Sequence, residues 1–285
     1  MSYISPIFET WSDRILDIDF RSNVPEGMSL GASERNVDTF RAPIVFEEKF
    51  KLLTDAEIID FIKEQDARGG NLDRLVVHRY DQNGEGTCTC NAGAAKYNIL
   101  AARQFGKDRV CPQSPISIYM KIASGPNTGS GVGDCLEQQV NIGSLPIDIS
   151  ESRIIMGKYA NDAHFMRAVG YDRRLYKSGW EVTADWFKIH EYYEIDTAQG
   201  FKTALANGWP VHYGRSGHSI LGVRLAVKSN TIYVIYLNSW GAWGETLNGI
   251  KAYGLDSPSA YGTGAQRYGA HCACSVVVPP WEIAA

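Results

Sequence analysis

The spacing of apolar residues changes along this chain of 285 residues, and the change restricts the folds open to it. Apolar residues recur at helical spacing in four segments, at 54–69, 94–106, 114–122 and 131–143. Continuous apolar runs follow at 219–227 and 231–237, and Lys228, Ser229 and Asn230 lie between them as a hairpin signal. Because helices precede strands instead of alternating with them, the pattern predicts an α+β chain with two lobes, one helical and one rich in strands.

Local signals mark where further elements begin and end. Thr54 and Glu57 match a capping box at the start of the first helix. Asp196 or Thr197 is expected to cap a later helix, which ends at an Asn-Gly pair before the strands begin. The apolar run Cys274–Val278 predicts a last strand, since two prolines follow it.

The N-terminal part of the chain has a different character. Residues 1–52 show no periodic apolar pattern and contain scattered Gly, Pro and charge. We expect them to form an arm that the amphipathic helix Thr54–Asp66 anchors on the body. The chain then divides into an N-terminal arm and helix, 1–75, and a folded domain, 76–285. Because the arm has too little apolar pattern for a core, we expect it to serve association with other chains.

The charge and cysteine content of the chain limit the binding partners and the cellular compartment that we expect for it. Lys and Arg total 28 against 32 Asp and Glu, so the chain lacks the basic excess of a nucleic-acid binder. No run of about 18 apolar residues is present to span a membrane. The first twenty residues also lack the basic start and apolar core of a secretory signal. The six cysteines are therefore expected to be free thiols in a reducing compartment, in the cytoplasm or in a virion.

A glycine-rich turn delivers a cysteine to the start of a predicted helix. Gly84 and Gly86 precede Cys88 directly, and the Ala-rich helical segment follows. Unpaired N–H groups and the helix dipole favour negative charge at such a position, so we expect the Cys88 thiol to ionise easily and act as a nucleophile. The amide of Gln82 could donate, beside the Cys88 N–H, to a developing oxyanion.

A histidine and an asparagine flank the predicted hairpin. His218 begins one apolar run and Asn238 ends the other, so pairing of the two strands would bring them to the same end of the sheet. An Asn that accepts from an imidazole N–H fixes the tautomer, and the other ring nitrogen can then take a thiol proton. His212 is a rival base, but it follows Val211 inside a strand, and we favour His218.

Together these residues resemble the papain-type cysteine peptidases. Gln82 and Cys88 match that family's oxyanion residue and nucleophile, and His218 matches its general base. Asn238-Ser-Trp-Gly matches its third catalytic residue and the tryptophan motif that follows. His218 and Asn238 follow Cys88 by 130 and 150 residues, which agrees with the family's spacing. The resemblance implies that Trp240 shields the His–Asn hydrogen bond from water.

The resemblance also implies a fold and a reaction. It covers about residues 76–285 and implies a papain-like fold with the site in a cleft between two lobes. The implied reaction is hydrolysis of peptide or isopeptide bonds in a peptide or protein substrate, without a cofactor. Glu85 stands where the family usually has a first Cys, and Thr89 follows the nucleophile, as in bacterial and phage-type members. Residues 1–75 do not resemble the family's inhibitory propeptide.

Other interpretations remain open at this point. A papain-like domain could instead be a structural or binding part of a larger assembly such as a phage particle. The same Cys–His chemistry would also suit a cell-wall amidase or transferase. No metal site is expected, because one residue separates Cys88 from Cys90 and Cys272 from Cys274, whereas structural zinc sites use two to four.

Overall fold

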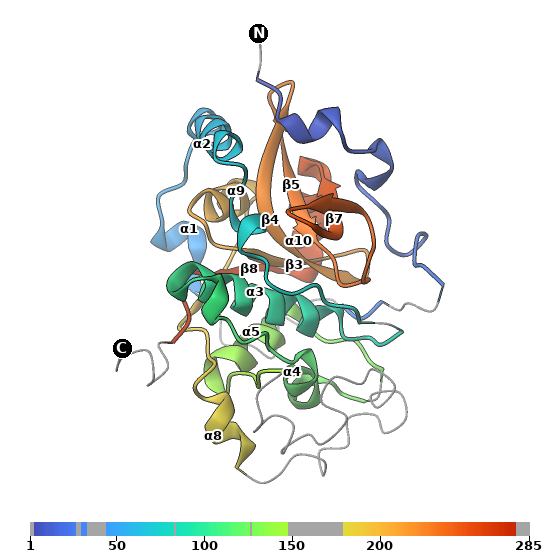
Figure 1. The fold of residues 1–285 in the computed structure, drawn as a ribbon, viewed down its shortest axis with the longest axis vertical. Coiled ribbons are helices and arrows are strands. Elements are labelled where there is room, and N and C mark those ends of the chain that lie inside the picture. The colour runs from blue at the N-terminus through green and yellow to red at the C-terminus, as the bar shows by residue number, and fades with distance from the viewer. Residues whose placement is uncertain are drawn as a thin grey trace.

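A helical half and a sheet half make up the molecule, as the apolar pattern predicts. The computed structural model describes residues 3–26, 30–32, 44–82, 84–125, 127–147 and 179–277. Helices fill the lower part of Figure 1, and a sheet forms the upper part. None of the helices in these ranges is both long enough and apolar enough to cross a membrane.

The helical half is arranged around one central helix. Its helices are α3 (Cys88–Phe105), α4 (Pro115–Ile122), α5 (Val132–Asn141) and α8 (Trp180–Ala184), of which the first three confirm the predicted helices. Every residue of α3 from Cys88 to Ala102 is buried. Small residues permit this, since a Cβ on Gly93 would lie 2.4 Å from the Sγ of Cys135 on α5.

The sheet half has eight strands within the described ranges. They are β1 (Ile44–Val45), β2 (Tyr192–Glu194), β3 (Val211–Arg215), β4 (His218–Lys228), β5 (Thr231–Leu237), β6 (Glu245–Leu247), β7 (Ile250–Asp256) and β8 (Ala270–Ala273). Their order is β1-β2-β8-β3-β4-β5-β7-β6, and of these pairs β1 and β2 run parallel while the others are antiparallel.

The central hairpin confirms one prediction, and the last strand corrects another. Strands β4 and β5 are joined at Ser229 and Asn230, whose φ values of 52° and 62° suit a tight turn. The last strand covers Ala270–Ala273, so its prediction at Cys274–Val278 was wrong. Pairing with β2 and β3 fixes the position of this strand, and the apolar run that suggested it begins after its end.

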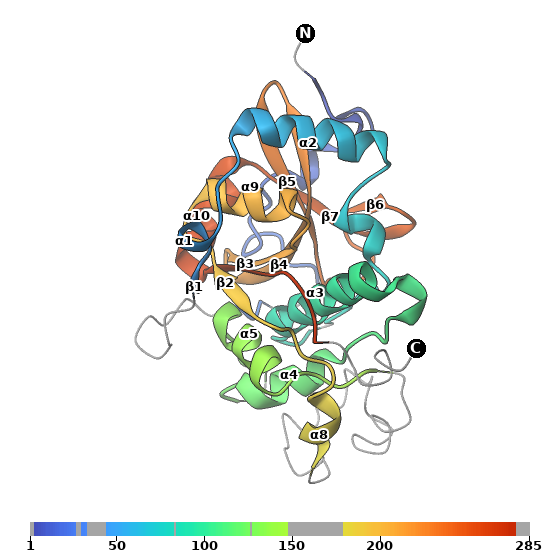
Figure 2. The same cartoon turned by 90° about the vertical axis from the view of Figure 1, so that its left-hand side faces the viewer.

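Three further helices pack on the sheet, and five shorter elements complete the described ranges. The helices are α2 (Asp55–Ala67), α9 (Ala198–Ala206) and α10 (Pro258–Tyr268); shorter turns are η1 (Pro6–Glu9), η2 (Asp13–Ile15), α1 (Phe46–Lys49), η3 (Leu72–Leu75) and η4 (Lys107–Arg109). Figure 2 shows α2 and α9 in front of the strands. The capping box of Thr54 and Glu57 is confirmed, and Thr197 caps α9 by accepting from Gly200 N at 2.9 Å.

The described parts of residues 1–52 pack on the body instead of extending from it. Ile7, Ile15, Phe20 and Phe46 are buried and belong to the same apolar core as the sheet. The Ser5 N–H donates to the Val227 carbonyl at the end of β4, at 2.8 Å. Ile7 and Ile15 lie in short 3₁₀ turns, Phe20 lies in a turn and Phe46 begins a helix of four residues. Such short elements have no long amphipathic period, and this is why the sequence pattern missed these residues.

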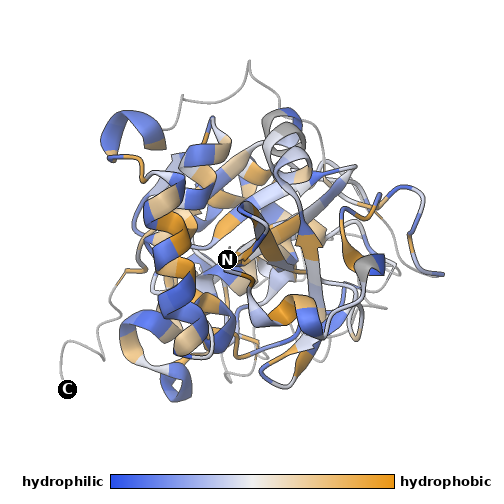
Figure 3. Ribbon diagram, turned by 90° about the horizontal axis from the view of Figure 1, so that it is seen from above, coloured by the Kyte–Doolittle hydropathy of each residue, from blue (hydrophilic) through white to orange (hydrophobic). Residues whose placement is uncertain are grey.

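A buried charged cluster also joins the N-terminal part to the sheet. Arg224 of β4 donates to Asp66 of α2 at 2.6 Å and to Asp73 of η3 at 3.0 Å. The Tyr3 hydroxyl donates to the other oxygen of Asp66 at 2.9 Å. In the view from above, hydrophilic and hydrophobic residues alternate along the outer helices (Figure 3). A shared core and a shared charged cluster indicate one cooperative unit.

We predict that truncating a core residue of α2 destabilises the whole chain in a single transition. Ile62 is fully buried, and Ile62→Ala should lower the free energy of unfolding by about 2–5 kcal/mol. The exposed Glu64→Ala on the same helix should change it by less than about 0.5 kcal/mol. Urea unfolding followed by circular dichroism and by tryptophan fluorescence measures both. Two separate transitions would contradict the shared core.

Candidate active site

Cys88 is the first residue of α3, and its thiol is fully buried. The preceding Thr87 is the N-cap residue, and its carbonyl and hydroxyl accept from the Asn91 side chain at 2.9 and 3.0 Å. These bonds fix the first turn of the helix. The turn that carries Gly84 and Gly86 is therefore held where the sequence analysis expected it, with the thiol at the helix N-terminus.

The hairpin brings His218 and Asn238 together. His218 begins β4, Asn238 directly follows β5, and His218 Nε2 lies 2.7 Å from Asn238 Oδ1. Within the described ranges the other ring nitrogen, Nδ1, has no hydrogen-bond partner. The Cys88 thiol lies against the backbone N–H of Ser219, the residue that follows His218. The structure thus places the thiol, the imidazole and the amide at the meeting of α3 and β4.

Two aromatic rings enclose the His218 imidazole. The Trp240 ring stacks on it with a centroid distance of 4.6 Å and an angle of 30°. The Phe20 ring meets it edge-on at 4.6 Å and contacts Trp240 at 5.4 Å. Trp240 is where the resemblance implied a shielding residue. Sequence reasoning missed Phe20, because an isolated aromatic in an aperiodic segment carries no signal of a long-range contact.

Gln82 lies beside the turn that leads to Cys88, and a serine holds it there. Its Nε2 donates to the Glu85 carbonyl at 2.8 Å, and its Oε1 accepts from the Ser239 hydroxyl at 2.6 Å. The Gln82 backbone N–H also donates to the Ser239 carbonyl at 2.8 Å. The sequence analysis did not single out Ser239, although it follows Asn238 directly.

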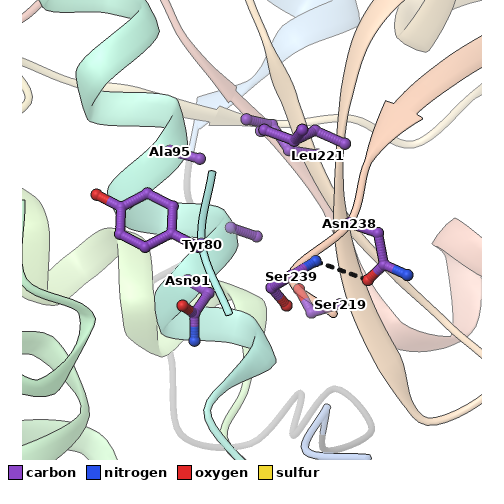
Figure 4. Close-up of a pocket in the computed structure, with 9 residues that line it drawn as sticks. Tyr80, Asn91, Ala95, Ser219, Leu221, Asn238 and Ser239 are labelled. Carbon is purple, nitrogen blue, oxygen red and sulfur yellow. Dashed lines mark hydrogen bonds between the residues drawn. The ribbon is translucent and has the colours of Figure 1, made fainter. Parts of the chain in front are cut away.

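A small cavity lies behind these residues, between α3 and the sheet (Figure 4). Its lining includes Tyr80 and Asn91 on the α3 side and Ser219, Asn238 and Ser239 on the sheet side. The cavity has a volume of about 10 Å³, which is about the size of one water. Cys88 does not line this cavity, which is too small to hold an amino-acid side chain.

Residues 30–32 of the N-terminal part lie over Cys88, whose thiol meets the Gly31 N–H. The Gly31 carbonyl accepts from Ser130 N at 2.8 Å, and Ala32 N donates to the Gly217 carbonyl at 2.9 Å. These bonds join the loop before α5 to the turn before β4. A Cβ on Gly31 would lie 2.2 Å from the Gly86 carbonyl oxygen, so the segment rests directly on the turn before Cys88. We call residues 30–32 the covering segment.

Burial under this cover decides the charge state of the pair. Burial raises the pKa of the Cys88 thiol to about 11, although N–H groups of Ser219 and Gly31 oppose the rise. Burial also lowers the pKa of His218 to about 4, and the hydrogen bond to Asn238 opposes this only in part. Both groups are therefore neutral near pH 7. The acidic thiol that the helix N-terminus predicted is absent from this form, because desolvation outweighs the helix dipole.

The rival residues lie elsewhere. His212 on β3 is fully buried, its Nε2 lies 2.7 Å from the Ser219 hydroxyl, and burial holds its pKa well below the ordinary value. Cys90 and Cys272 are buried thiols whose pKa values burial raises. Among the described residues no group of three or more His, Cys, Asp or Glu side chains could hold a metal ion.

We predict that displacing the covering segment exposes Cys88. In Gly31→Val the new side chain collides with the Gly86 carbonyl, so the segment must move away. Alkylation of Cys88 by iodoacetamide at pH 7.5 should then be at least about tenfold faster, since the thiol regains water and its pKa falls. The exposed Glu26→Val should leave the rate unchanged. Peptide mapping separates Cys88 from Cys111 and Cys274, and equal rates in the two variants would refute the prediction.

We further predict that acid weakens the packing around His218. The folded chain holds this imidazole neutral down to about pH 4, whereas an exposed one takes up a proton near pH 6.5. Stability from this group is therefore complete above pH 6.5 and falls by about 2–3 kcal/mol by pH 4.5. Urea unfolding of the wild type and of His218→Gln at pH 7.5 and 4.5 measures the difference. Both chains share all other titrating groups, so the comparison removes their contributions. The loss of stability between pH 7.5 and 4.5 should be larger in the wild type, and an equal loss in both chains would contradict the prediction.

Comparison with solved structures identifies the fold. Xylellain, a cysteine protease from Xylella fastidiosa, matches with a TM-score of 0.59 and 18% identity over 88% of this chain and 97% of its own. Procathepsin L2 from the larval midgut of Tenebrio molitor matches with 0.56 and 14% over 98% and 95%. Procathepsin B S9 from Trypanosoma congolense matches with 0.51 and 11% over 86% of each chain.

Sequence comparison adds nothing to this result. No protein-family model matches the chain, and no curated protein sequence does. The structural likeness nevertheless extends over most of both chains in each pair. The chain therefore has the α+β fold of the papain-like cysteine proteases, with a helical region followed by an antiparallel sheet.

Proposed function

We propose that the chain is a cysteine peptidase in which Cys88 is the nucleophile and His218 its general base. The observation that supports this most is the 2.7 Å contact between His218 Nε2 and Asn238 Oδ1, which leaves Nδ1 without a partner. An Asn that accepts from Nε2–H keeps Nδ1 unprotonated and able to take the Cys88 proton. The peptidase fold supports a peptide or protein as the substrate.

The proposed reaction is acyl transfer to water. His218 Nδ1 takes the thiol proton while Cys88 Sγ attacks the substrate carbonyl carbon. The oxyanion is held by the Cys88 N–H and the Gln82 amide, which Ser239 keeps in place. His218 then gives its proton to the leaving amine as the C–N bond breaks. A water that His218 deprotonates hydrolyses the thioester and restores the thiol.

The form described here is the latent form of this peptidase. The covering segment lies against the Cys88 thiol, and in this form both Cys88 and His218 are buried and neutral. Displacing the segment would return water to the site, and both pKa values would move back toward their ordinary range. Two of the similar structures, the procathepsins, are named as pro-forms. Activity therefore requires that residues 30–32 move or are removed.

A purely structural role in an assembly has less support. It depends on an N-terminal arm that projects to other chains, whereas Ile7, Ile15, Phe20 and Phe46 of that part are buried in the chain's own core. A catalytic role also explains why a buried histidine is aligned by Asn238 and stacked by Trp240. An amidase or transferase would use the same residues. Substrate screening distinguishes these enzymes from a peptidase, because they differ in the amine that leaves and in the molecule that accepts the acyl group.

We predict distinct effects for the four proposed residues once the covering segment is displaced. In a Gly31→Val background, Cys88→Ala and His218→Ala should abolish hydrolysis of a fluorogenic peptide library. Gln82→Ala should slow the chemical step by about 10²–10³, the usual cost of one oxyanion donor. Asn238→Ala should leave measurable activity, because nucleophile and base remain while their orientation is impaired.

The matched control is His212→Ala, which removes the rival histidine. It should keep hydrolysis, provided that circular dichroism shows a native fold. Loss of activity in the folded His212 variant together with full activity in His218→Ala would assign the base to His212 and refute the proposal. A thiol-directed epoxide that labels a cysteine other than Cys88 would refute it independently.

A further inference from the structure

A second cavity lies beside the β3–β4 turn. It has a volume of about 390 Å³, which lies within the usual size range of small-molecule sites. Arg21 lines it from the N-terminal part, Arg215 and Ser216 line it from the end of β3, and Ser259 and Arg267 line it from α10. Three guanidinium groups therefore converge on one cavity from three elements that are distant in sequence.

The carboxylates near this cavity are already bonded. Asp256 accepts from Arg215 Nε and Nη2 at 3.0 and 2.9 Å, below the cavity. Asp19, which also lines the cavity, accepts from the Ser22 hydroxyl at 2.6 Å and from the Arg21 N–H at 3.1 Å. Asp17 accepts from the N–H and the hydroxyl of Ser257, both at 2.6 Å.

The arginines that line the cavity outnumber its one carboxylate, Asp19, which stays charged beside Arg21 and Arg215. The Arg21 guanidinium donates to a neutral partner, the Tyr268 hydroxyl, at 2.7 Å. Arg215 donates to Asp256 from Nε and Nη2 and is only 6% exposed. The hydroxyls of Ser216 and Ser259 add short donors. Several guanidinium groups around one space match an anion with several oxygens, of which phosphate is the common biological example.

We propose that this cavity binds a small phosphate-bearing anion, and that the bound anion holds the N-terminal part on the body. One wall of the cavity is Arg21 and the other walls belong to the body, so an anion between them joins the two. Phe20, next to Arg21, packs on His218, and the Arg215 guanidinium lies over the Phe20 ring at 4.7 Å. A ligand that binds the closed form alone shifts the equilibrium toward it in proportion to its concentration.

This coupling reaches the covering segment through the β3–β4 turn. Ser216 and Gly217 form that turn, with φ values of 53° and 78°. A Cβ on Gly217 would lie 3.6 Å from both Arg21 Nε and Leu30 Cδ1, so the turn touches the cavity's arginine and the covering segment together. The Gly217 carbonyl also accepts from Ala32 N. The anion is therefore expected to slow opening over Cys88. An effect of the anion on peptide hydrolysis rests on the proposed function, whereas its binding to the cavity does not.

Titration calorimetry with the full chain tests the binding. The probes are inorganic phosphate, glucose 6-phosphate as an organic phosphate, and citrate as a carboxylate of similar charge. Arg21→Gln and Arg267→Gln should each raise the dissociation constant of the phosphate probe at least about tenfold. Arg14→Gln, an exposed loss of the same charge in the N-terminal part, should leave it unchanged. Circular dichroism establishes that each variant is folded.

The relative affinities of the probes distinguish an organic phosphate from free phosphate as the ligand. Tighter binding of glucose 6-phosphate than of inorganic phosphate supports an organic phosphate, and the reverse order supports free phosphate. Three results would overturn the proposal. They are citrate binding as tightly as the phosphate probes, no binding of a phosphate probe to the wild type, and a loss of affinity in Arg14→Gln as large as in Arg21→Gln.

Alkylation of Cys88 by iodoacetamide tests the coupling without any peptidase activity. Saturating phosphate probe should slow the alkylation several-fold in the wild type and leave the rate unchanged in Arg21→Gln. Phosphate that binds without slowing the alkylation would overturn the coupling. Failure of the proposed peptidase function is recognised separately, since the binding and alkylation results would then stand while hydrolysis is absent.

Discussion

The structure depends on keeping an uncharged thiol and an uncharged imidazole out of water. A buried ion pair would need strong compensating contacts, and the surroundings of Cys88 and His218 are mainly apolar rings and backbone. Phe20 and Trp240 close two sides of the imidazole, and residues 30–32 close the approach to the thiol. The same desolvation that encloses the pair therefore also keeps both groups uncharged.

The parts of the site that could be predicted from sequence are those fixed by local geometry. A tight turn between β4 and β5 brings His218 and Asn238 to the same end of the sheet, and the turn signal and strand lengths are visible in the sequence. The position of Cys88 follows in the same way, from a glycine-rich turn ahead of a helix. The charge state of the pair did not follow, because burial is a tertiary property that no local pattern encodes.

What the sequence could not provide came from contacts between segments far apart in the chain. Phe20 meets His218 across about two hundred residues, and Arg21 reaches Tyr268 across a longer span. Both lie in a part of the chain built of short turns, whose apolar residues show no period and so suggested an arm without a core. Strand β8 was misplaced for a related reason, since its neighbours in the sheet define it more than its own hydropathy does.

The two described parts of the N-terminal region differ in how firmly they are held, and this difference bears on how the site opens. Residues 3–26 bury Ile7, Ile15 and Phe20, and Arg21 is bonded to Tyr268. Residues 30–32 are held within the described ranges by backbone hydrogen bonds to Gly217 and Ser130 and by the packing of Leu30 against the core. Losing these contacts costs less than exposing three buried apolar side chains, each worth about 1.5–3 kcal/mol. We therefore expect opening over Cys88 to begin at the covering segment.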